Sequence, residues 1–248
     1  RKPVTVCTLT ERHRIELWPT SPSFLNLLLV SEEYRHYDLS SLRMISYGAE
    51  PMPQTLLSRI REIFPKVKLL QTYGLIELGV LRSKSKDSDS LWMKLGGEGY
   101  ATRVVDGLLQ IKADSAMLGY LNAASPFTED GYFKTGDQVE QSDDYLRIVG
   151  RASEVINVGG EKVHPQEVEN IILELPDVHD VTVYPRPNIL LGNIVCAKIT
   201  TADNSTLSRQ QVKRHCASRL SKYKVPVKID WSLDLNYSQR QKKVRLGN

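Results

Sequence analysis

Hydrophobic residues are arranged in two kinds of pattern in the first 80 residues. In some segments apolar residues recur every three or four positions, a spacing that predicts amphipathic helices. Between these segments lie short apolar runs of the length of a strand. We predict helices at residues 3–12, 21–30 and 53–64, and strands at residues 15–18, 44–47 and 67–70. Strands that alternate with helices favour an α/β fold with a parallel sheet.

The predicted strands indicate a binding edge, because ligands bind beyond the carboxyl ends of the strands in such sheets. Two of these ends run into segments of small and polar residues. The first contains Gly48, Ala49, Glu50 and Pro51, and the second contains Gln71, Thr72, Tyr73, Gly74, Ile76 and Glu77. By composition alone, the second segment also fits an ordinary turn at the end of a strand.

Residues 83–90 form a polar run, SKSKDSDS, without an apolar residue that a core could bury. We therefore expect a mobile surface loop there. Residues 91–120 then carry glycines between short β-rich runs, such as 102–105 and 108–112. This pattern predicts a small barrel-like region or an antiparallel sheet.

A β-hairpin is predicted where two strand-like runs, residues 139–141 and 145–149, flank a polar turn. Folding the chain about Asp143 brings Asp137 opposite Gly150 and Arg151. A carboxylate accepts hydrogen bonds through two oxygens and suits a vicinal diol such as a ribose, whereas a guanidinium suits oxyanions. An ordinary surface ion pair is the alternative interpretation of this pair.

The composition changes after Arg151 to that of a compact α+β unit. A helix starts at Pro165, and a second helix is predicted at residues 207–220. Strands are predicted at residues 178–184, 194–200 and 227–231. We therefore expect two domains: residues 1–151, with a sheet part (1–80) and a β-rich part (91–151), and a separate α+β domain at residues 152–248.

Composition narrows the class of protein. Of the 248 residues 41% are hydrophobic and 25% charged, which is enough to bury a real core. We expect neither a membrane span nor a signal peptide. The three cysteines are an odd number without a C-x-x-C pair, which argues against a disulfide framework or a zinc site and favours a cytoplasmic setting. The histidines show no spacing typical of metal ligands.

Three segments carry a resemblance to a known family. They are YFKTGD at residues 132–137, the pair Gly150-Arg151, and GEKVHPQEVE at residues 160–169. In order and spacing they resemble the Y-x-x-T-G-D, G-R and G-x-x-V-x-P-x-E-(I/V)-E elements of the adenylate-forming superfamily. That superfamily includes acyl- and aryl-CoA synthetases, adenylation domains of peptide synthetases, and luciferases.

The resemblance implies a nucleotide site at the two strand ends and at the hairpin. GAEP at residues 48–51 resembles the loop that lines the adenine and acyl pockets, and QTYGLIE at residues 71–77 resembles Q-x-Y-G-x-T-E. It implies that Tyr73 and Gly74 lie against the nucleotide and that Glu77 binds the Mg²⁺ that bridges the ATP phosphates. Asp137 would hold the ribose. Ile76 stands where the family usually has a hydroxyl residue that contacts the α-phosphate.

The resemblance also assigns residues to the later part of the chain. LNYSQRQK at residues 235–242 aligns with L-P-x-T-x-x-G-K, which makes Lys242 the catalytic lysine. The proline and the glycine of this element are missing, and Lys243 is the alternative if the loop is one residue longer. Ser153 occupies the hinge position. The glycines Gly159 and Gly160 would line a pantetheine tunnel, although a plain tight turn explains them equally.

By resemblance, the protein is an ATP-dependent ligase that converts a carboxylic acid to an acyl-adenylate and then transfers it to CoA or to a carrier-protein phosphopantetheine. The Gly/Ser/Thr-rich phosphate loop of the superfamily is not in the sequence, so we expect the C-terminal half of such an enzyme: the end of the large domain (1–151) and the small mobile domain (152–248). A non-catalytic nucleotide-binding or scaffolding relative is the alternative. The net charge is +4, and a basic cluster at residues 240–245 is the basis of a weaker nucleic-acid interpretation, which the lysine loop makes unnecessary.

Overall fold

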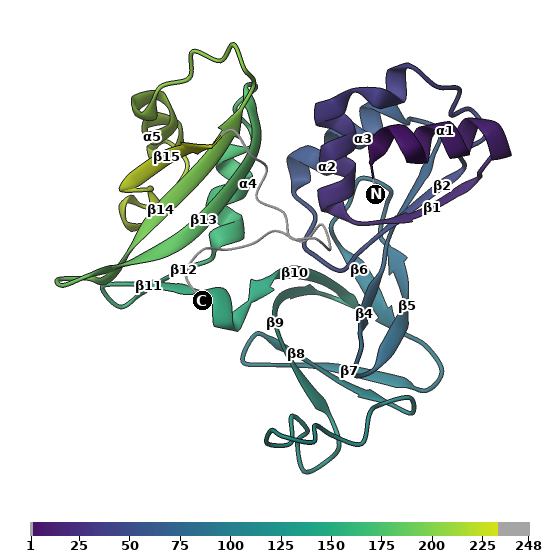
Figure 1. The fold of residues 1–248 in the computed structure, drawn as a ribbon. Coiled ribbons are helices and arrows are strands. Elements are labelled where there is room, and N and C mark those ends of the chain that lie inside the picture. Colours follow the sequence, from purple (N-terminus) through teal and green to yellow (C-terminus); the bar gives the residue numbers. More distant parts are fainter. Residues whose placement is uncertain (1, 233–248) are drawn as a thin grey trace. The chain divides into compact units, whose positions relative to one another are not determined.

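The computed structural model describes residues 2–232. Contacts divide the chain into two compact units, which Figure 1 shows coloured along the sequence. The first unit comprises the residues up to 22 together with 33–52 and 57–153, and the second comprises 23–32, 53–56 and the residues from 154 onward. The boundary between the units in the later part of the chain therefore falls directly after Ser153.

A three-stranded parallel sheet lies in the first unit. Its strands are β1 (Leu17–Thr20), β2 (Met44–Tyr47) and β3 (Lys68–Gln71), in that order. The register pairs Thr20 with Tyr47 and Tyr47 with Gln71, so the three strands end at the same level. The helices of this part of the chain are α1 (Pro3–His13), α2 (Pro22–Ser31), η1 (Glu33–Arg35) and α3 (Gln54–Ile63).

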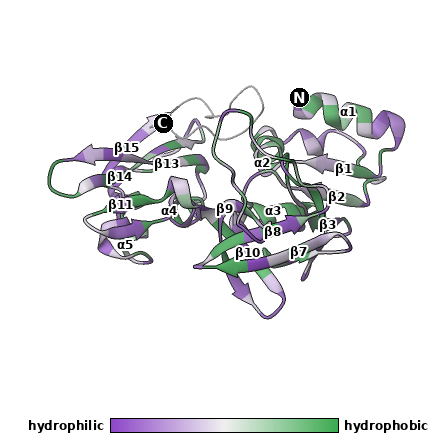
Figure 2. Ribbon diagram, turned by 90° about the horizontal axis from the view of Figure 1, so that it is seen from below, coloured by the Kyte–Doolittle hydropathy of each residue, from purple (hydrophilic) through white to green (hydrophobic). Residues whose placement is uncertain are grey.

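Amphipathic patterning explains how α1 is held. The helix carries apolar and polar residues side by side along its length (Figure 2). Its buried residues are Cys7 and Thr10, and the hydroxyl of Thr10 accepts a hydrogen bond of 2.8 Å from the indole nitrogen of Trp18 on β1. The helix ends at Arg14, whose φ of 52° is left-handed.

The second sheet of this unit is antiparallel and has seven strands. They are β4 (Tyr73–Leu75), β5 (Gly79–Ser85), β6 (Met93–Gly96), β7 (Tyr100–Val105), β8 (Leu108–Ala113), β9 (Phe133–Ser142) and β10 (Tyr145–Arg151). The strand order β4-β5-β6-β10-β9-β8-β7 is open. The barrel-like region that the sequence predicted is thus an antiparallel sheet that does not close. Its core includes Leu78, Met93, Leu109, Ile111 and Leu146.

The prediction of a mobile loop at residues 83–90 is wrong for its first three residues. Strand β5 continues to Ser85, which pairs with Met93 on β6. The hydroxyl of Ser83 donates to the backbone oxygen of Gln71 at 2.6 Å, and the hydroxyl of Ser85 accepts from the backbone nitrogen of Gln71 at 3.1 Å. These serines serve as hydrogen-bonding partners of β3, a role that a hydrophobicity pattern cannot report.

The second unit is a mixed sheet with helices. Its elements are η2 (Ala152–Glu154, which crosses the boundary), β11 (Ile156–Val158), β12 (Glu161–Val163), α4 (Pro165–Ile172), β13 (Val178–Asn188), β14 (Gly192–Thr201), α5 (Arg209–Ala217), η3 (Lys222–Lys224) and β15 (Lys228–Ser232). The strand order is β12-β11-β14-β13, and β15 pairs with β14 in parallel. The buried carboxylate of Glu169 on α4 accepts the backbone N–H of Val183 at 2.8 Å and so ties the helix to the sheet.

Candidate functional site

The β9–β10 hairpin confirms the expected placement of Asp137. Its turn contains Asp143 in a left-handed conformation (φ 52°). The register is irregular between Ile148 and Gly150, and beyond this bulge Arg151 pairs directly with Asp137. A bulge re-aims the residues that follow it. Here it sets Arg151, rather than Gly150, opposite the carboxylate.

The Asp137 carboxylate is buried, with 5% of the residue exposed. One oxygen lies 2.9 Å from Nε of Arg151, and the other accepts a hydrogen bond of 2.5 Å from the hydroxyl of Tyr73. The backbone nitrogen of Asp137 donates to the hydroxyl of Thr135 at 3.0 Å. Buried charges in proteins are paired and hydrogen-bonded. This arrangement replaces the alternative of an ordinary surface ion pair, because one partner is almost fully withdrawn from water.

Burial is also the main reason why the pKa of Tyr73 is strongly raised, and the neighbouring Asp137 charge adds to the effect. The phenol therefore keeps its proton and acts as a donor. Arg151, in contrast, has half of its side chain exposed. A guanidinium has five N–H groups, so Arg151 can bind the carboxylate through Nε and still present donors to an anion outside.

The two strand-end segments come together at Gly48 and Thr72. The backbone N–H and the hydroxyl of Thr72 both donate to the backbone oxygen of Tyr47, at 2.7 and 3.0 Å. A Cβ atom on Gly48 would lie 2.5 Å from the Thr72 hydroxyl oxygen and 2.6 Å from its carbonyl oxygen. Only glycine fits this close approach. A Cβ on Gly74 would likewise lie 2.9 Å from the carbonyl oxygen of Gly79.

The remaining residues of these segments differ in exposure. Ala49 adopts a left-handed φ of 70°, which strains a residue that has a Cβ, and such outliers gather at ligand sites. Ala49 and Pro51 are exposed and Glu50 is half-buried. Gln71 is buried, and its side-chain oxygen has no hydrogen-bond partner among residues 2–232.

Glu77 follows β4 and holds a half-buried carboxylate. One carboxylate oxygen accepts a hydrogen bond of 2.6 Å from the hydroxyl of Tyr120. The preceding residue, Ile76, is 99% exposed, so no core packing requires an apolar side chain there. Within the described residues no three His, Cys, Asp or Glu side chains gather as a metal site. A single carboxylate is nonetheless the usual protein share of a Mg²⁺ site that phosphate oxygens and water complete.

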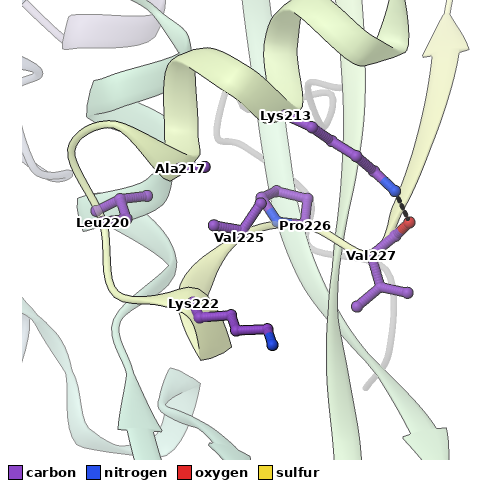
Figure 3. Close-up of a pocket in the computed structure, with 7 residues that line it drawn as sticks. All are labelled: Lys213, Ala217, Leu220, Lys222, Val225, Pro226 and Val227. Carbon is purple, nitrogen blue, oxygen red and sulfur yellow. Dashed lines mark hydrogen bonds between the residues drawn. The ribbon is translucent and has the colours of Figure 1, made fainter.

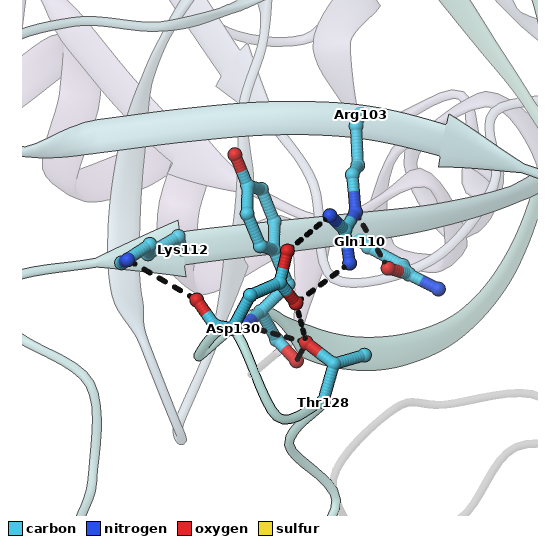
Figure 4. A network of polar contacts seen from close by, with 6 residues as sticks. Arg103, Gln110, Lys112, Thr128 and Asp130 are labelled. Carbon is cyan, nitrogen blue, oxygen red and sulfur yellow. Dashed lines mark hydrogen bonds and ion pairs between the residues drawn. The ribbon is translucent and has the colours of Figure 1, made fainter.

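A polar network holds the chain just before β9. Arg103 binds the carboxylate of Asp130 through two nitrogens, at 2.5 and 3.0 Å (Figure 4). Its guanidinium also lies 3.9 Å from the ring centre of Tyr132. The hydrogen bond from Arg103, with a second from Thr128, lowers the pKa of Asp130 to about 2. This network fixes the turn that leads into the strand that carries Asp137.

Glycines Gly159 and Gly160 form the turn between β11 and β12, with left-handed φ angles of 60° and 93°. The N–H of Gly159 donates to the carbonyl oxygen of Leu191 at 2.8 Å, and that of Gly160 donates to the side-chain oxygen of Asn157 at 2.9 Å. The backbone therefore accounts for both glycines as a tight turn. A role in thiol delivery stays a prediction.

The second unit also has a groove of about 360 Å³ beside α5. Its lining is mostly apolar and comprises Lys213, Ala217, Leu220, Lys222, Val225, Pro226 and Val227 (Figure 3). The Lys213 ammonium donates to the backbone oxygen of Val227 at 2.7 Å. This lining offers no carboxylate that could hold a ribose, so the groove is a poor candidate for the nucleotide site.

The predicted hinge residue and the predicted catalytic lysine lie in the later part of the chain. Ser153 lies in η2, at the boundary between the two units. Lys242 and its alternative Lys243 lie outside the described residues. Among residues 2–232, no helix has both the length and the apolar character needed to cross a bilayer.

Comparison with known proteins matches the chain to AMP-binding enzymes and CoA ligases. Residues 1–133 match the model of the AMP-binding enzyme family, and residues 167–237 match that of the AMP-binding enzyme C-terminal domain. The chain is 31% identical over 240 residues to an indoleacetate–CoA ligase of Aromatoleum aromaticum, a match that covers 88% of this chain and 46% of that protein. It is 30% identical over 243 residues to a long-chain-fatty-acid–CoA ligase of Mycobacterium tuberculosis, with coverage of 90% and 48%.

The fold also matches solved structures. The chain is similar to the crystal structure of ATP-bound MatB from Rhodopseudomonas palustris, with a TM-score of 0.80, 24% identity, and coverage of 96% of this chain and 51% of that one. The chain spans about half the length of the curated relatives it matches.

Proposed function

The chain belongs to the family of AMP-binding enzymes, and from this premise we propose that the protein activates a carboxylic acid with ATP and transfers the acyl group to a thiol. In the first step a carboxylate oxygen attacks the α-phosphorus, the bond to the bridging oxygen breaks, and pyrophosphate leaves. In the second step a thiolate sulfur attacks the acyl carbon and AMP leaves. The thiol belongs to CoA or to a carrier-protein phosphopantetheine.

The buried Asp137 carboxylate is the observation that carries this proposal. Tyr73 and Arg151 orient this carboxylate, so it needs little reorganisation to accept hydrogen bonds from two ribose hydroxyls. Each carboxylate oxygen can accept more than one hydrogen bond. The exposed part of Arg151 provides positive charge beside the same site for a phosphate oxygen.

Glu77 would hold Mg²⁺, since it presents a hard oxygen donor with one oxygen already oriented by Tyr120. When bound, the ion would neutralise charge on the departing pyrophosphate. Ile76 lacks the hydroxyl that family members use on the α-phosphate, so this chain supplies one donor fewer at that position.

Lys242 would bridge the substrate carboxylate and the α-phosphate during adenylation. A lysine suits this role because its ammonium is a compact charge on a long, flexible stem. Positioning and charge neutralisation supply most of the catalysis in such reactions. The Gly159–Gly160 turn would then serve the thiol step after a rotation at Ser153.

Acid-dependent exchange of labelled pyrophosphate into ATP by the intact protein tests this function. A library of fatty, aryl and amino acids serves as substrate, and mass spectrometry identifies the adenylate. Exchange that Lys242→Ala abolishes and Lys243→Ala retains supports the mechanism and its register. ATP binding without exchange for any acid would instead support a non-catalytic nucleotide-binding relative, an alternative that the exposed Ile76 favours.

A further inference from the structure

The segment from Asp114 to Tyr120 is fastened along the turn that carries Glu77. The backbone N–H of Met117 donates to the backbone oxygen of Glu77 at 2.8 Å. The hydroxyl of Ser115 donates to the backbone oxygen of Leu78 at 2.6 Å. The hydroxyl of Tyr120 then donates to the Glu77 carboxylate itself at 2.6 Å. Three hydrogen bonds therefore hold the backbone and the side chain of the same glutamate turn.

The Tyr120–Glu77 bond is not a by-product of core packing. Tyr120 is 46% exposed, so core packing does not fix the position of its ring. Its hydroxyl nevertheless hydrogen-bonds to the carboxylate of Glu77. The hydroxyl contacts the carboxylate that is the candidate metal ligand, and this contact places Tyr120 beside the candidate nucleotide site.

A hydrogen bond to one carboxylate oxygen selects the orientation of the whole group and leaves the second oxygen with its lone pairs available to a cation. In metal sites the groups that orient a ligating carboxylate contribute to metal affinity without touching the metal. We infer that Tyr120 is a positioning residue that orients Glu77 to receive the divalent cation of a nucleotide–metal complex. This inference rests on the proposed function of Glu77.

The test compares ATP binding with and without metal, in the absence of any acid, so that no turnover occurs. Calorimetric titration of the intact protein gives the Kd of ATP with Mg²⁺ and with EDTA, and the ratio of the two constants is the metal-dependent gain. Tyr120→Phe keeps the ring and removes only the hydroxyl. We expect it to lower this gain about tenfold while the Kd in EDTA stays at the wild-type value.

Tyr100→Phe is the matched control, since the Tyr100 hydroxyl lies 3.2 Å from that of Ser115 on the same segment but makes no contact with Glu77. It should retain the wild-type gain, and Glu77→Gln should lose it. A wild-type gain in Tyr120→Phe, or an equal change in Mg²⁺ and in EDTA, would overturn the inference and leave the role of Glu77 standing. A wild-type protein without any metal-dependent gain would overturn both.

Discussion

Tyr73 and Asp137 form a phenol–carboxylate pair inside the antiparallel sheet. The phenol is 8% exposed and the aspartate 5%. In such an environment a hydrogen bond is stronger than in water, and a lost partner costs more. The pair therefore contributes to the stability of the fold as well as to the shape of the candidate site.

Tyr73→Phe should destabilise the protein by about 1–3 kcal/mol, because the buried carboxylate loses a donor that no water replaces. Urea unfolding of both proteins measures the difference. Tyr100→Phe removes only a phenolic hydroxyl whose 3.2 Å hydrogen bond with Ser115 lies at the surface, and it should change the free energy of unfolding by less than about 0.5 kcal/mol. Equal effects of the two substitutions would show that burial of the pair is unimportant.

The sequence predicts some of these residues and not others. The opposition of Asp137 and Arg151 follows from hairpin register, which is local and can be counted along the chain. The donors Tyr73 and Tyr120 reach their carboxylates from 64 and 43 residues away in the sequence. No spacing rule reports such contacts, because they depend on how the strands pack.

At the scale of elements, the ends of β2 and β3 are locked together through Thr72 and Gly48. Thr72 makes two hydrogen bonds to Tyr47, which leaves the backbone of Gly48 pressed against Thr72. This contact fixes the spacing of the two segments in which the nucleotide residues are predicted.

Gly48→Ala should separate these segments, because the added methyl group meets backbone as well as side-chain atoms of Thr72. We expect a destabilisation of about 1–3 kcal/mol and weaker AMP binding, measured by thermal unfolding and calorimetry. Adding Thr72→Ser to Gly48→Ala leaves the backbone carbonyl of residue 72 in the way of the new methyl group. The double variant should therefore not regain wild-type stability. Wild-type stability of Gly48→Ala would contradict the tight contact.

Element prediction succeeds where burial follows a period and fails where it does not. The helix predicted at residues 3–12 is α1 (Pro3–His13), and the strand predicted at 44–47 is β2. The sequence pattern predicts neither of the short strands β4 and β5, whereas β6 falls within the β-rich region predicted at residues 91–120. Strand β5 alternates exposed and half-buried polar residues that hydrogen-bond to neighbours, so its sequence lacks the apolar alternation that marks a strand.

At the scale of the whole molecule, the division of the chain after Ser153 supports the proposed hinge. Hinges absorb large φ and ψ changes in a few residues at the ends of elements. Ser153 is part of a single three-residue helical turn, η2, rather than of a long element. Rotation there would let the lysine loop and the Gly159–Gly160 turn serve the two half-reactions in succession.

Ser153→Pro should trap one orientation, because proline fixes φ near −65°. One half-reaction should fall by about 100-fold while the other is largely retained. Pyrophosphate exchange reports adenylation, and single-turnover transfer of a purified acyl-adenylate to CoA reports thioester formation. Ser153→Ala leaves φ free and should behave as the wild type. Equal retention of both half-reactions in Ser153→Pro would refute the hinge.

The most direct measurement of the central claim is the AMP affinity of Asp137→Ala in the intact protein, determined by calorimetry beside Asp137→Asn, which keeps the shape of the side chain. Two ribose hydroxyls without their acceptor should weaken AMP binding by about 1–3 kcal/mol, roughly 5- to 150-fold. Asp38→Ala removes an exposed aspartate that is also paired with an arginine, Arg14, and should bind AMP normally. Wild-type AMP affinity in a folded Asp137→Ala protein would contradict the account.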